Sequence, residues 1–256
     1  MKKNLVLNYQ QNFEENLTNY AYGEILAKKY NLECVYENIT SKREAFEKEM
    51  KNISLDYSYI STSRAKEASK KAYIENFKNN ASHINSIKKN HSYIDLAHFA
   101  LEDISYINPA LIEKFKFKNL DFIKNYDILD EILTTSSIGL YISKNDIEKN
   151  LVDYEFLNKA FKRLNKYVKK PIVYVFTDYN DEIDFSYPIK TKTINLKNKT
   201  EEFYFLSNCK HKIIDPSNYS YSRNLWAGLI NFKEYSIFIY KKDKKSKFKR
   251  KNWISI

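Results

Sequence analysis

Glycine is scarce in this chain, and its scarcity limits the kinds of site that the chain can build. Only 3 of the 256 residues are glycine, at positions 23, 139 and 228, where an average usage of about 7% would give roughly 18. These positions can form neither GxGxxG nor GxxxxGK[ST], which excludes dinucleotide and P-loop sites that are cradled by glycine. Any nucleotide bound by this protein must therefore be held by other groups.

Several further classes of protein are not indicated by the sequence. Cys34 and Cys209 form no CxxC pair, and the four histidines show no HExxH pattern, so neither a disulfide framework nor a zinc site is predicted. No apolar run approaches the roughly 18 residues of a membrane span, and the first ten residues lack a hydrophobic signal core. We therefore expect a cytoplasmic protein.

The positive charge is concentrated near the C-terminus. The net charge is +11, and residues 241–251 (KKDKKSKFKRK) contribute eight basic residues and one acid to it. Such a segment suits three interpretations, namely a solvated tail, a peripheral contact with anionic lipid at the inner face of the cytoplasmic membrane, or a grip on a nucleic-acid backbone. The rest of the chain carries little net charge, which makes a nucleic-acid-binding protein the least favoured of the three.

The second half of the sequence alternates short apolar runs with amphipathic segments. Strands are predicted over 137–143, 171–178, 210–215 and 235–241. Helices are predicted over 126–133, 155–168, 202–208 and 218–230. Buried strands that alternate with helices in this way are typical of an α/β domain with a parallel sheet.

The first half is predicted to be richer in helix. Strands are expected over 3–8 and 32–37, and helices over 17–29, from a capping box of Ser41 and Glu44 onward, over 63–90, over 93–104 and over 110–117. We place the domain boundary near residue 134. The predicted domains are thus residues 1–133 and residues 134–256.

Three of the predicted strands in the second half lead into a carboxylate, and ligands of open parallel sheets bind beyond the carboxyl ends of the strands. The acids are Asp146, Asp178 and Asp215, which could accept hydrogen bonds from a ribose or a guanine edge. After Asp215, the residues Ser217, Asn218 and Ser220 stand at a predicted helix start, where backbone N–H groups attract a diphosphate without glycine. The alternative interpretation is a set of ordinary helix caps and loop acids.

One stretch closely resembles a known family. Residues 202–214 (EFYFLSNCKHKII) resemble D-x-x-L-M-S-x-C-K-H-x-I-I, the characteristic stretch of the bacterial α-1,2-fucosyltransferases (glycosyltransferase family 11). The residues that match in register, with Glu202 standing for Asp, are Glu202, Leu206, Ser207, Cys209, Lys210, His211, Ile213 and Ile214. The segments 19–31, YVFTD with Asp178, and 217–231 resemble further family elements in the same order.

The chain departs from the family pattern at two places. The family's G-G-L-G-N-Q loop corresponds to QQNFEEN (10–16), which has no glycine and contains Glu14 and Glu15. The family's H-x-R-x-G-D-Y corresponds to YISKNDI (141–147), in which only Asp146 is retained. The missing arginine would grip the donor diphosphate with a bidentate fork that serine cannot supply, so Lys144 and Arg223 are the candidate replacements.

The resemblance implies a GT-B-like α/β fold of two Rossmann-like halves, with the acceptor on the N-terminal side and the nucleotide-sugar on the C-terminal side. It implies inverting transfer of a sugar from a nucleotide-diphosphate donor such as GDP-fucose to a hydroxyl of an oligosaccharide or lipid-linked surface glycan, with no obligatory metal. The implied donor-binding residues are Lys144, Asp178, Glu202, Ser207, His211, Ser217, Asn218, Ser220 and Arg223. The candidate bases are Asp146, Glu14 and Glu15. The alternative is a catalytically inactive relative that retains a glycan- or nucleotide-binding pocket.

Overall fold

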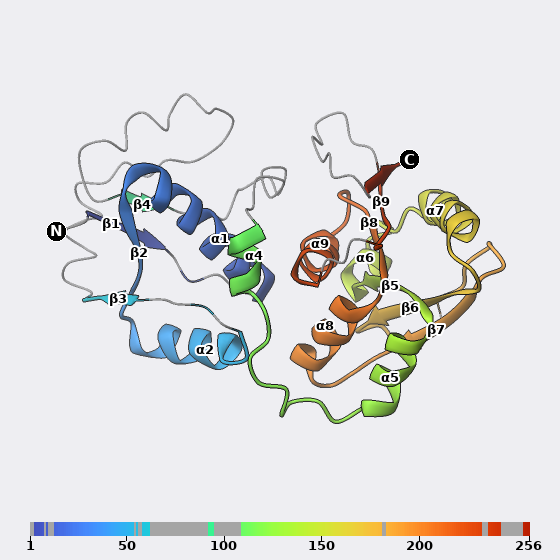
Figure 1. The fold of residues 1–256 in the computed structure, drawn as a ribbon, viewed down its shortest axis with the longest axis horizontal. Coiled ribbons are helices and arrows are strands. Elements are labelled where there is room, and N and C mark those ends of the chain that lie inside the picture. Colours follow the sequence, from blue (N-terminus) through green and yellow to red (C-terminus); the bar gives the residue numbers. More distant parts are fainter. Residues whose placement is uncertain are drawn as a thin grey trace. The chain divides into compact units, whose positions relative to one another are not determined.

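The computed structural model divides the chain into two compact units, Met1–Lys118 and Asn119–Ile256 (Figure 1). It describes residues 3–7, 9, 13–53, 55, 58–61, 92–94, 109–180, 183–231, 235–241 and 253–256. The division falls earlier than the boundary predicted near residue 134. Helix α5 (Tyr126–Thr134) accounts for the difference, because it packs against α8 (Lys199–Asn208) and β5 (Ser136–Ile142) of the second unit.

The first unit is built on a parallel sheet with the strand order β3-β2-β1-β4. Its strands are β1 (Lys3–Leu7), β2 (Leu32–Glu37), β3 (Ser58–Ile60) and β4 (Ser92–Ile94). The helix predicted over 93–104 is wrong at its start, because Tyr93 and Ile94 pair with Val6 and Leu7 of β1. Pairing with a distant strand overrides the local pattern there. The helix predicted over 63–90 and residues 95–104 lie outside the described residues.

The described helices of the first unit are α1 (Phe13–Tyr30), α2 (Thr40–Met50) and α4 (Pro109–Lys114). Helix α1 begins one turn before the predicted start. The capping box of Ser41 and Glu44 is wrong, since α2 begins at Thr40, and Ile39 caps it without a side-chain hydrogen bond. The strands predicted over 3–8 and 32–37 are confirmed as β1 and β2.

The second unit contains a sheet of six strands in the order β10-β9-β8-β5-β6-β7, and every neighbouring pair is parallel. The strands after β5 are β6 (Pro171–Thr177), β7 (Lys190–Ile194), β8 (His211–Ile214), β9 (Phe238–Tyr240) and β10 (Trp253–Ser255). Counted from β5 as the first, this is the 3-2-1-4-5-6 order of a Rossmann-like sheet. The direction of winding reverses between β5 and β8, so a ligand site is expected at that point.

Helices cover both faces of this second sheet. They are α5, α6 (Lys144–Glu148), α7 (Tyr154–Tyr167), α8 and α9 (Tyr221–Ile230). The apolar side of α7 packs on alternate residues of the central strands, such as Ile138, Leu140 and Val173, in one core cluster. Helices α8 and α9 pack against each other and against β5 on the other face (Figure 1). The prediction of an α/β domain with a parallel sheet is confirmed.

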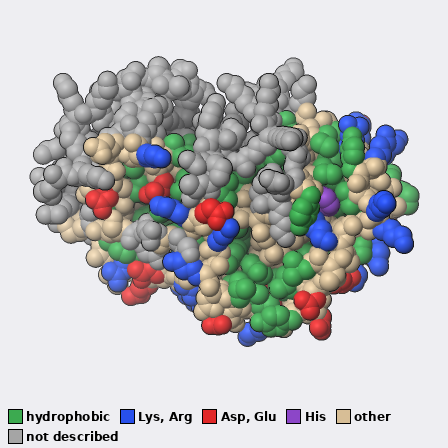
Figure 2. Space-filling model, in the orientation of Figure 1, with side chains coloured by type: hydrophobic (Ala, Val, Ile, Leu, Met, Phe, Trp, Pro, Cys, Tyr) green, Lys and Arg blue, Asp and Glu red, His purple; other side chains and the backbone are tan. Residues whose placement is uncertain are grey.

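The basic segment 241–251 is a connection between strands and not a terminal tail. Strand β9 ends at Tyr240, and Trp253–Ser255 returns to pair with it as β10. Residues 242–252 lie outside the described residues. Elsewhere on the face shown in Figure 2, Lys and Arg side chains stand in several separate groups among acidic and hydrophobic ones. None of the helices in the described part of the chain combines the length and apolar character needed to cross a bilayer.

Candidate functional site

The candidate site lies along the carboxyl edge of the second sheet, which we define as the edge formed by the C-terminal ends of its strands. The acids Asp146, Asp178 and Asp215 follow β5, β6 and β8 at this edge, as predicted. Hydrogen bonds connect their loops, because the backbone N–H of Lys144 donates to Asp178 Oδ1 at 2.6 Å. The N–H of Tyr219, from the loop after β8, donates to Asp146 Oδ1 at 2.7 Å.

Asp146 is fully buried and its carboxylate is saturated with hydrogen bonds. Oδ2 accepts from the N–H of Ser143 at 3.1 Å, from Ser143 Oγ at 2.7 Å and from Ser220 Oγ, while Oδ1 accepts from Tyr219. These bonds tie the start of α6 to the loop that precedes α9. The proposed role of Asp146 as a catalytic base is not supported by this enclosure, which makes it a positioning residue.

The anion site predicted at the start of α9 is not formed as expected. Helix α9 begins at Tyr221, and donors of Ser217, Tyr219 and Ser220 before it bind the two neighbouring aspartates. Ser220 is buried and bound to Asp146, while the N–H and Oγ of Ser217 both donate to Asp215 Oδ1. Asp215 Oδ2 and Asn218 Oδ1 are buried acceptors with no hydrogen-bond partner among the described residues. A turn rich in acceptors does not favour a phosphate.

Lys241, the first residue of the basic segment, is tied to this same turn. Its Nζ lies 2.8 Å from Asp153 Oδ2, 3.1 Å from Ser217 Oγ and 3.8 Å from Asp215 Oδ1. Burial works to lower the pKa of Lys241, but the hydrogen bond with Asp153 and the charge of Asp215 raise it overall. The same hydrogen bond lowers the pKa of Asp153. Lys241 therefore joins β9 to the N-terminus of α7 and to the loop after β8.

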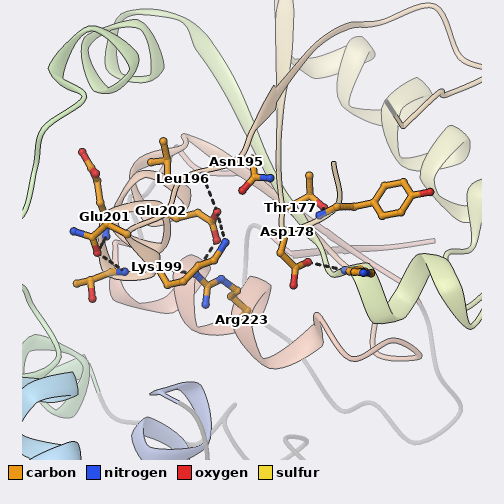
Figure 3. A network of polar contacts seen from close by, with 12 residues as sticks. Thr177, Asp178, Asn195, Leu196, Lys199, Glu201, Glu202 and Arg223 are labelled. Carbon is orange, nitrogen blue, oxygen red and sulfur yellow. Dashed lines mark hydrogen bonds and ion pairs between the residues drawn. The ribbon is translucent and has the colours of Figure 1, made fainter. Parts of the chain in front are cut away.

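Glu202, Lys199 and Arg223 form a cluster of three charged side chains at this edge (Figure 3). Glu202 is fully buried; its Oε2 accepts from Lys199 Nζ at 3.0 Å and from the N–H of Leu196 at 3.3 Å. Arg223 Nη2 donates to Glu202 Oε1 and to the carbonyl of Lys199, both at 3.1 Å. Glu202 is one of the predicted donor-binding residues, and here both of its carboxylate oxygens are buried and bound to cations.

Two aromatic rings contact Arg223, and burial affects the pKa of Glu202. The guanidinium carbon of Arg223 lies 4.6 Å from the ring centroid of Tyr141 and 5.5 Å from that of Phe203, so both rings make cation–π contacts with the side chain. Burial raises the pKa of Glu202, although Arg223 and Lys199 oppose this shift. Lys199 was missed by the sequence analysis. Its position three residues before Glu202 on one helix was the signal that could have identified it.

Asp178 and Lys144 occupy the neighbouring strand ends. Asp178 follows β6, the second strand in the winding order, and its side chain is exposed apart from the hydrogen bond that Oδ1 accepts from Lys144. An acid at the end of that strand is the usual partner of a ribose hydroxyl in Rossmann-like sheets. Lys144 Nζ lies 3.5 Å from Glu148 Oε1 in an exposed pair, which contributes little to stability.

Ser207 and His211, two predicted donor-binding residues, lie at the opposite, amino edge of the sheet. Ser207 Oγ donates to the carbonyl of Tyr204 at 2.7 Å within α8, which leads into the start of β8. His211 is the first residue of β8, and its Nδ1 accepts from the N–H of Ile237 at 3.1 Å. Burial, together with the charges of Lys212 and Lys210, lowers the pKa of His211 to about 4, so the imidazole is neutral. The structure therefore does not bring these two residues together with the predicted donor-binding residues of the carboxyl edge.

Glu14 and Glu15, the other candidate bases, stand in the first turn of α1 in the first unit. Glu14 is buried and Glu15 is exposed. Glu49, which no sequence pattern indicated, accepts a hydrogen bond from Asn16 Nδ2 at 2.9 Å. Burial raises the pKa of Glu49, the bond from Asn16 lowers it and the charge of Glu14 raises it further. The first unit thus holds an acidic pair close to α1, at positions 14 and 49.

No group of three or more His, Cys, Asp or Glu side chains in the described ranges is placed to hold a metal ion. No protein-family model matches the chain, and no curated protein is significantly similar to it.

Proposed function

We propose that this protein is a glycosyltransferase that binds a nucleotide-sugar at the carboxyl edge of the second sheet. The donor would be GDP-fucose or a related nucleoside diphosphate sugar, and the acceptor a hydroxyl of an oligosaccharide or lipid-linked surface glycan. Two parallel α/β units, each with the order 3-2-1-4 among its first four strands, agree with a GT-B architecture. The resemblance of residues 202–214 to the α-1,2-fucosyltransferases supports the same assignment.

The observation that carries the proposal is that one edge offers both an exposed acid and a pair of cations. Asp178 would accept hydrogen bonds from the ribose hydroxyls, and Arg223 with Lys199 would bind the diphosphate. This assignment moves the phosphates from the acceptor-rich turn of Ser217 to the Glu202 cluster. Arg223 would then supply the positive charge that an arginine of the H-x-R-x-G-D-Y element provides in the family and that this chain lacks at that position.

The proposed reaction needs two kinds of assistance. The acceptor hydroxyl attacks the anomeric carbon as the bond from that carbon to the diphosphate oxygen breaks, and the nucleoside diphosphate leaves. Arg223 and Lys199 would stabilise the negative charge that develops on the leaving oxygen. A carboxylate would take the hydroxyl proton, and Glu14 and Glu15 stay the predicted candidates for this step.

Calorimetric titration of the full chain with GDP, UDP, ADP and CDP tests the binding step. We expect one diphosphate to bind, and Asp178→Asn to weaken it about tenfold through the ribose contact. Arg223→Met is expected to weaken it by a factor of about ten to a hundred. Arg163→Met is the matched control, because Arg163 also stacks on a tyrosine, at 5.2 Å from the Tyr167 ring centroid, but on the outer helix α7. Failure of every nucleotide to bind would refute the proposal.

A second candidate is a relative that binds the nucleotide but transfers no sugar. The enclosure of Asp146 favours it, since the one acid that this chain shares with the family's H-x-R-x-G-D-Y element is engaged in four hydrogen bonds. Incubation with nucleotide-sugars and simple glycans, followed by chromatography of the free nucleotide, separates the two candidates. Release of nucleotide that is lost in Asp178→Asn supports the enzyme, and tight binding without release supports the inactive relative.

A peripheral membrane contact through residues 241–251 belongs to the same proposal. A lipid-linked acceptor would place the protein at an anionic surface, where each basic residue contributes about 1 kcal/mol of attraction. Sedimentation with vesicles that contain phosphatidylglycerol, compared with neutral vesicles, tests this contact. Binding to both kinds of vesicle, or to neither, would contradict it.

A further inference from the structure

Glu202 and its two cations form a cluster of one buried negative charge and two positive charges. The side chain of Glu202 has no exposed surface, whereas that of Lys199 is 47% exposed and that of Arg223 is 13% exposed. The cations are the part of the cluster that a ligand can reach, and the carboxylate lies behind them. Any phosphate that binds here therefore competes with Glu202 for the same two cations.

We propose that Glu202 is an internal counter-ion of the phosphate site, which positions Lys199 and Arg223 for the ligand and takes up a proton when phosphates bind to them. This inference rests on the proposed function, because it assigns the diphosphate to this cluster. It makes Glu202 a positioning residue that responds to pH, and not a contact for the nucleoside. It also predicts that a ligand binds more tightly as the pH falls.

The positioning role follows from the distances. The two oxygens of one carboxylate each hold a cation, with Lys199 Nζ at 3.0 Å from Oε2 and Arg223 Nη2 at 3.1 Å from Oε1. Arg223 also donates to the carbonyl of Lys199, so the backbone of α8 limits how far the two cations separate. Cation–π contacts with the rings of Tyr141 and Phe203 further restrict the guanidinium. The pair is thus arranged before any ligand arrives.

The proton uptake follows from the charges that face Glu202. Lys199 comes from α8, Arg223 comes from α9, and the N–H of Leu196 comes from the loop after β7; all three favour the ionised carboxylate. Burial opposes them. A phosphate that draws on both cations adds negative charge close to a carboxylate that water cannot reach, which favours the protonated form. Binding and protonation then assist each other.

The neighbouring Glu201 provides a matched control. It is also buried and lies in the same turn of α8, but its Oε1 accepts from the N–H groups of Lys124 and Asn125 and from Asn125 Nδ2, at 2.6, 2.8 and 3.1 Å. Its described partners are thus neutral groups of the loop before α5. Glu201→Gln changes a buried carboxylate to an amide without touching the cation pair.

Calorimetric titration with inorganic pyrophosphate, at pH 6, 7 and 8 in buffers of different ionisation enthalpy, tests the inference on the full chain. Pyrophosphate itself changes protonation over this pH range, so the contribution of Glu202 is the difference between the unmodified protein and Glu202→Gln. Glu202→Gln keeps an amide oxygen for Arg223 but removes the competing charge. We expect the unmodified protein to take up more protons on binding than Glu202→Gln does, and Glu202→Gln to bind about tenfold more tightly at pH 8 and by a smaller factor at pH 6. Glu202→Asp, which stays ionisable, should retain the uptake, and Glu201→Gln should match the unmodified protein.

The failures of the two proposals are distinguishable. Equal proton uptake by the unmodified protein and Glu202→Gln overturns the inference and leaves the proposed function standing. So does binding that Glu202→Gln weakens or leaves unchanged while the variant melts as the unmodified protein does. Absence of binding for both pyrophosphate and the nucleoside diphosphates overturns the proposed function and the inference with it.

Discussion

The carboxyl and amino edges of the second sheet differ in whether their charged and polar side chains are exposed to solvent. At the carboxyl edge, the side chains of Lys144, Asp178 and Lys199 keep contact with solvent, and even the buried Glu202 is bound to cations. At the amino edge, His211 is buried and neutral, and the fully buried Lys212 donates to the carbonyls of Cys209 and Ser207 at the end of α8. Polar groups at the amino edge therefore stabilise the fold, while several charged groups at the carboxyl edge stay accessible to a ligand.

This difference changes what the resemblance to the fucosyltransferases means. The matching segment 202–214 runs from the carboxyl edge, along α8, to the amino edge and back into β8. Only Glu202 among its matched residues belongs to the candidate site. The other matched residues lie in α8, in β8 and in the turn between them, and all of them except Lys210 are buried. The likeness therefore falls mostly on the interior of a structural unit. We therefore expect substitutions at the amino edge to alter the stability of the fold and substitutions at the carboxyl edge to alter nucleotide binding.

Asp146 is the expected exception and the largest effect, because it lies at the carboxyl edge but has a structural role. Asp146→Ala leaves the N–H of Tyr219 and the hydroxyls of Ser143 and Ser220 without the carboxylate that accepts from them, although the N–H of Ser143 still donates to Ser220 Oγ at 2.8 Å. We expect a loss of about 3 to 4 kcal/mol in the free energy of unfolding, measured by urea denaturation. Asp178→Ala is the control at the same edge, since it removes one hydrogen bond of an exposed side chain and should cost less than about 1 kcal/mol. Equal costs for the two variants would contradict the positioning role of Asp146.

His211 tests the amino edge through pH. Its pKa is about 4 in the folded protein against an ordinary value of 6.5, so the folded state binds fewer protons between these values. The stability that depends on neutral His211 is present above pH 6.5 and is lost as the pH falls towards 4. His211→Asn keeps an acceptor for the N–H of Ile237 but cannot titrate.

Urea unfolding of both proteins at pH 7 and pH 4.5 measures this effect. The unmodified protein should lose about 2 kcal/mol more than His211→Asn between the two values, because other titrating groups contribute equally to both proteins. Equal losses of unfolding free energy in the two proteins would show that burial does not keep His211 neutral in the folded state.

Gly139 tests how closely α8 and β8 pack on β5. A Cβ atom at this position would lie 2.9 Å from Cys209 Cβ and 2.9 Å from Leu206 Cδ1. We expect Gly139→Ala to cost about 2 kcal/mol in urea unfolding, because both neighbours are held in the core. Gly228→Ala is the matched control, since its nearest neighbours are 3.5 Å away and alanine favours the helix by up to about 1 kcal/mol. An unchanged unfolding free energy in Gly139→Ala would indicate that Leu206 and Cys209 pack loosely against β5.

The parts of the fold that could be predicted are those in which local pattern and tertiary environment agree. The strands β5 and β6 are mostly apolar and buried, and α7 has one apolar side, so their signals are local. Strand β7 was missed because its sequence KTKTI is mostly polar and lies at the edge of the sheet. Strand β10 was missed because it is separated from its partner β9 by the basic segment.

The candidate site was predictable only in its outline. The acids at the strand ends follow from the rule for parallel sheets, and Arg223 was named from its charge. The burial of Asp146 could not be predicted, because it depends on Tyr219 and Ser220, which are more than 70 residues away. The pairing of Glu202 with Arg223 likewise depends on the contact between α8 and α9.

The smallest expected effect separates the two placements of the phosphates at the carboxyl edge. Lys241 is the cation of the Ser217 turn, with its Nζ at 3.1 Å from Ser217 Oγ, and 31% of its side chain is exposed. Lys241→Met should cost less than about 1 kcal/mol of stability, as expected for a partly exposed ion pair. It should also leave nucleoside diphosphate affinity unchanged within about twofold, whereas Arg223→Met weakens it at least about tenfold. If Lys241→Met weakens binding as much as Arg223→Met does, the phosphates lie at the start of α9 and the Glu202 cluster is an internal ion pair of the fold.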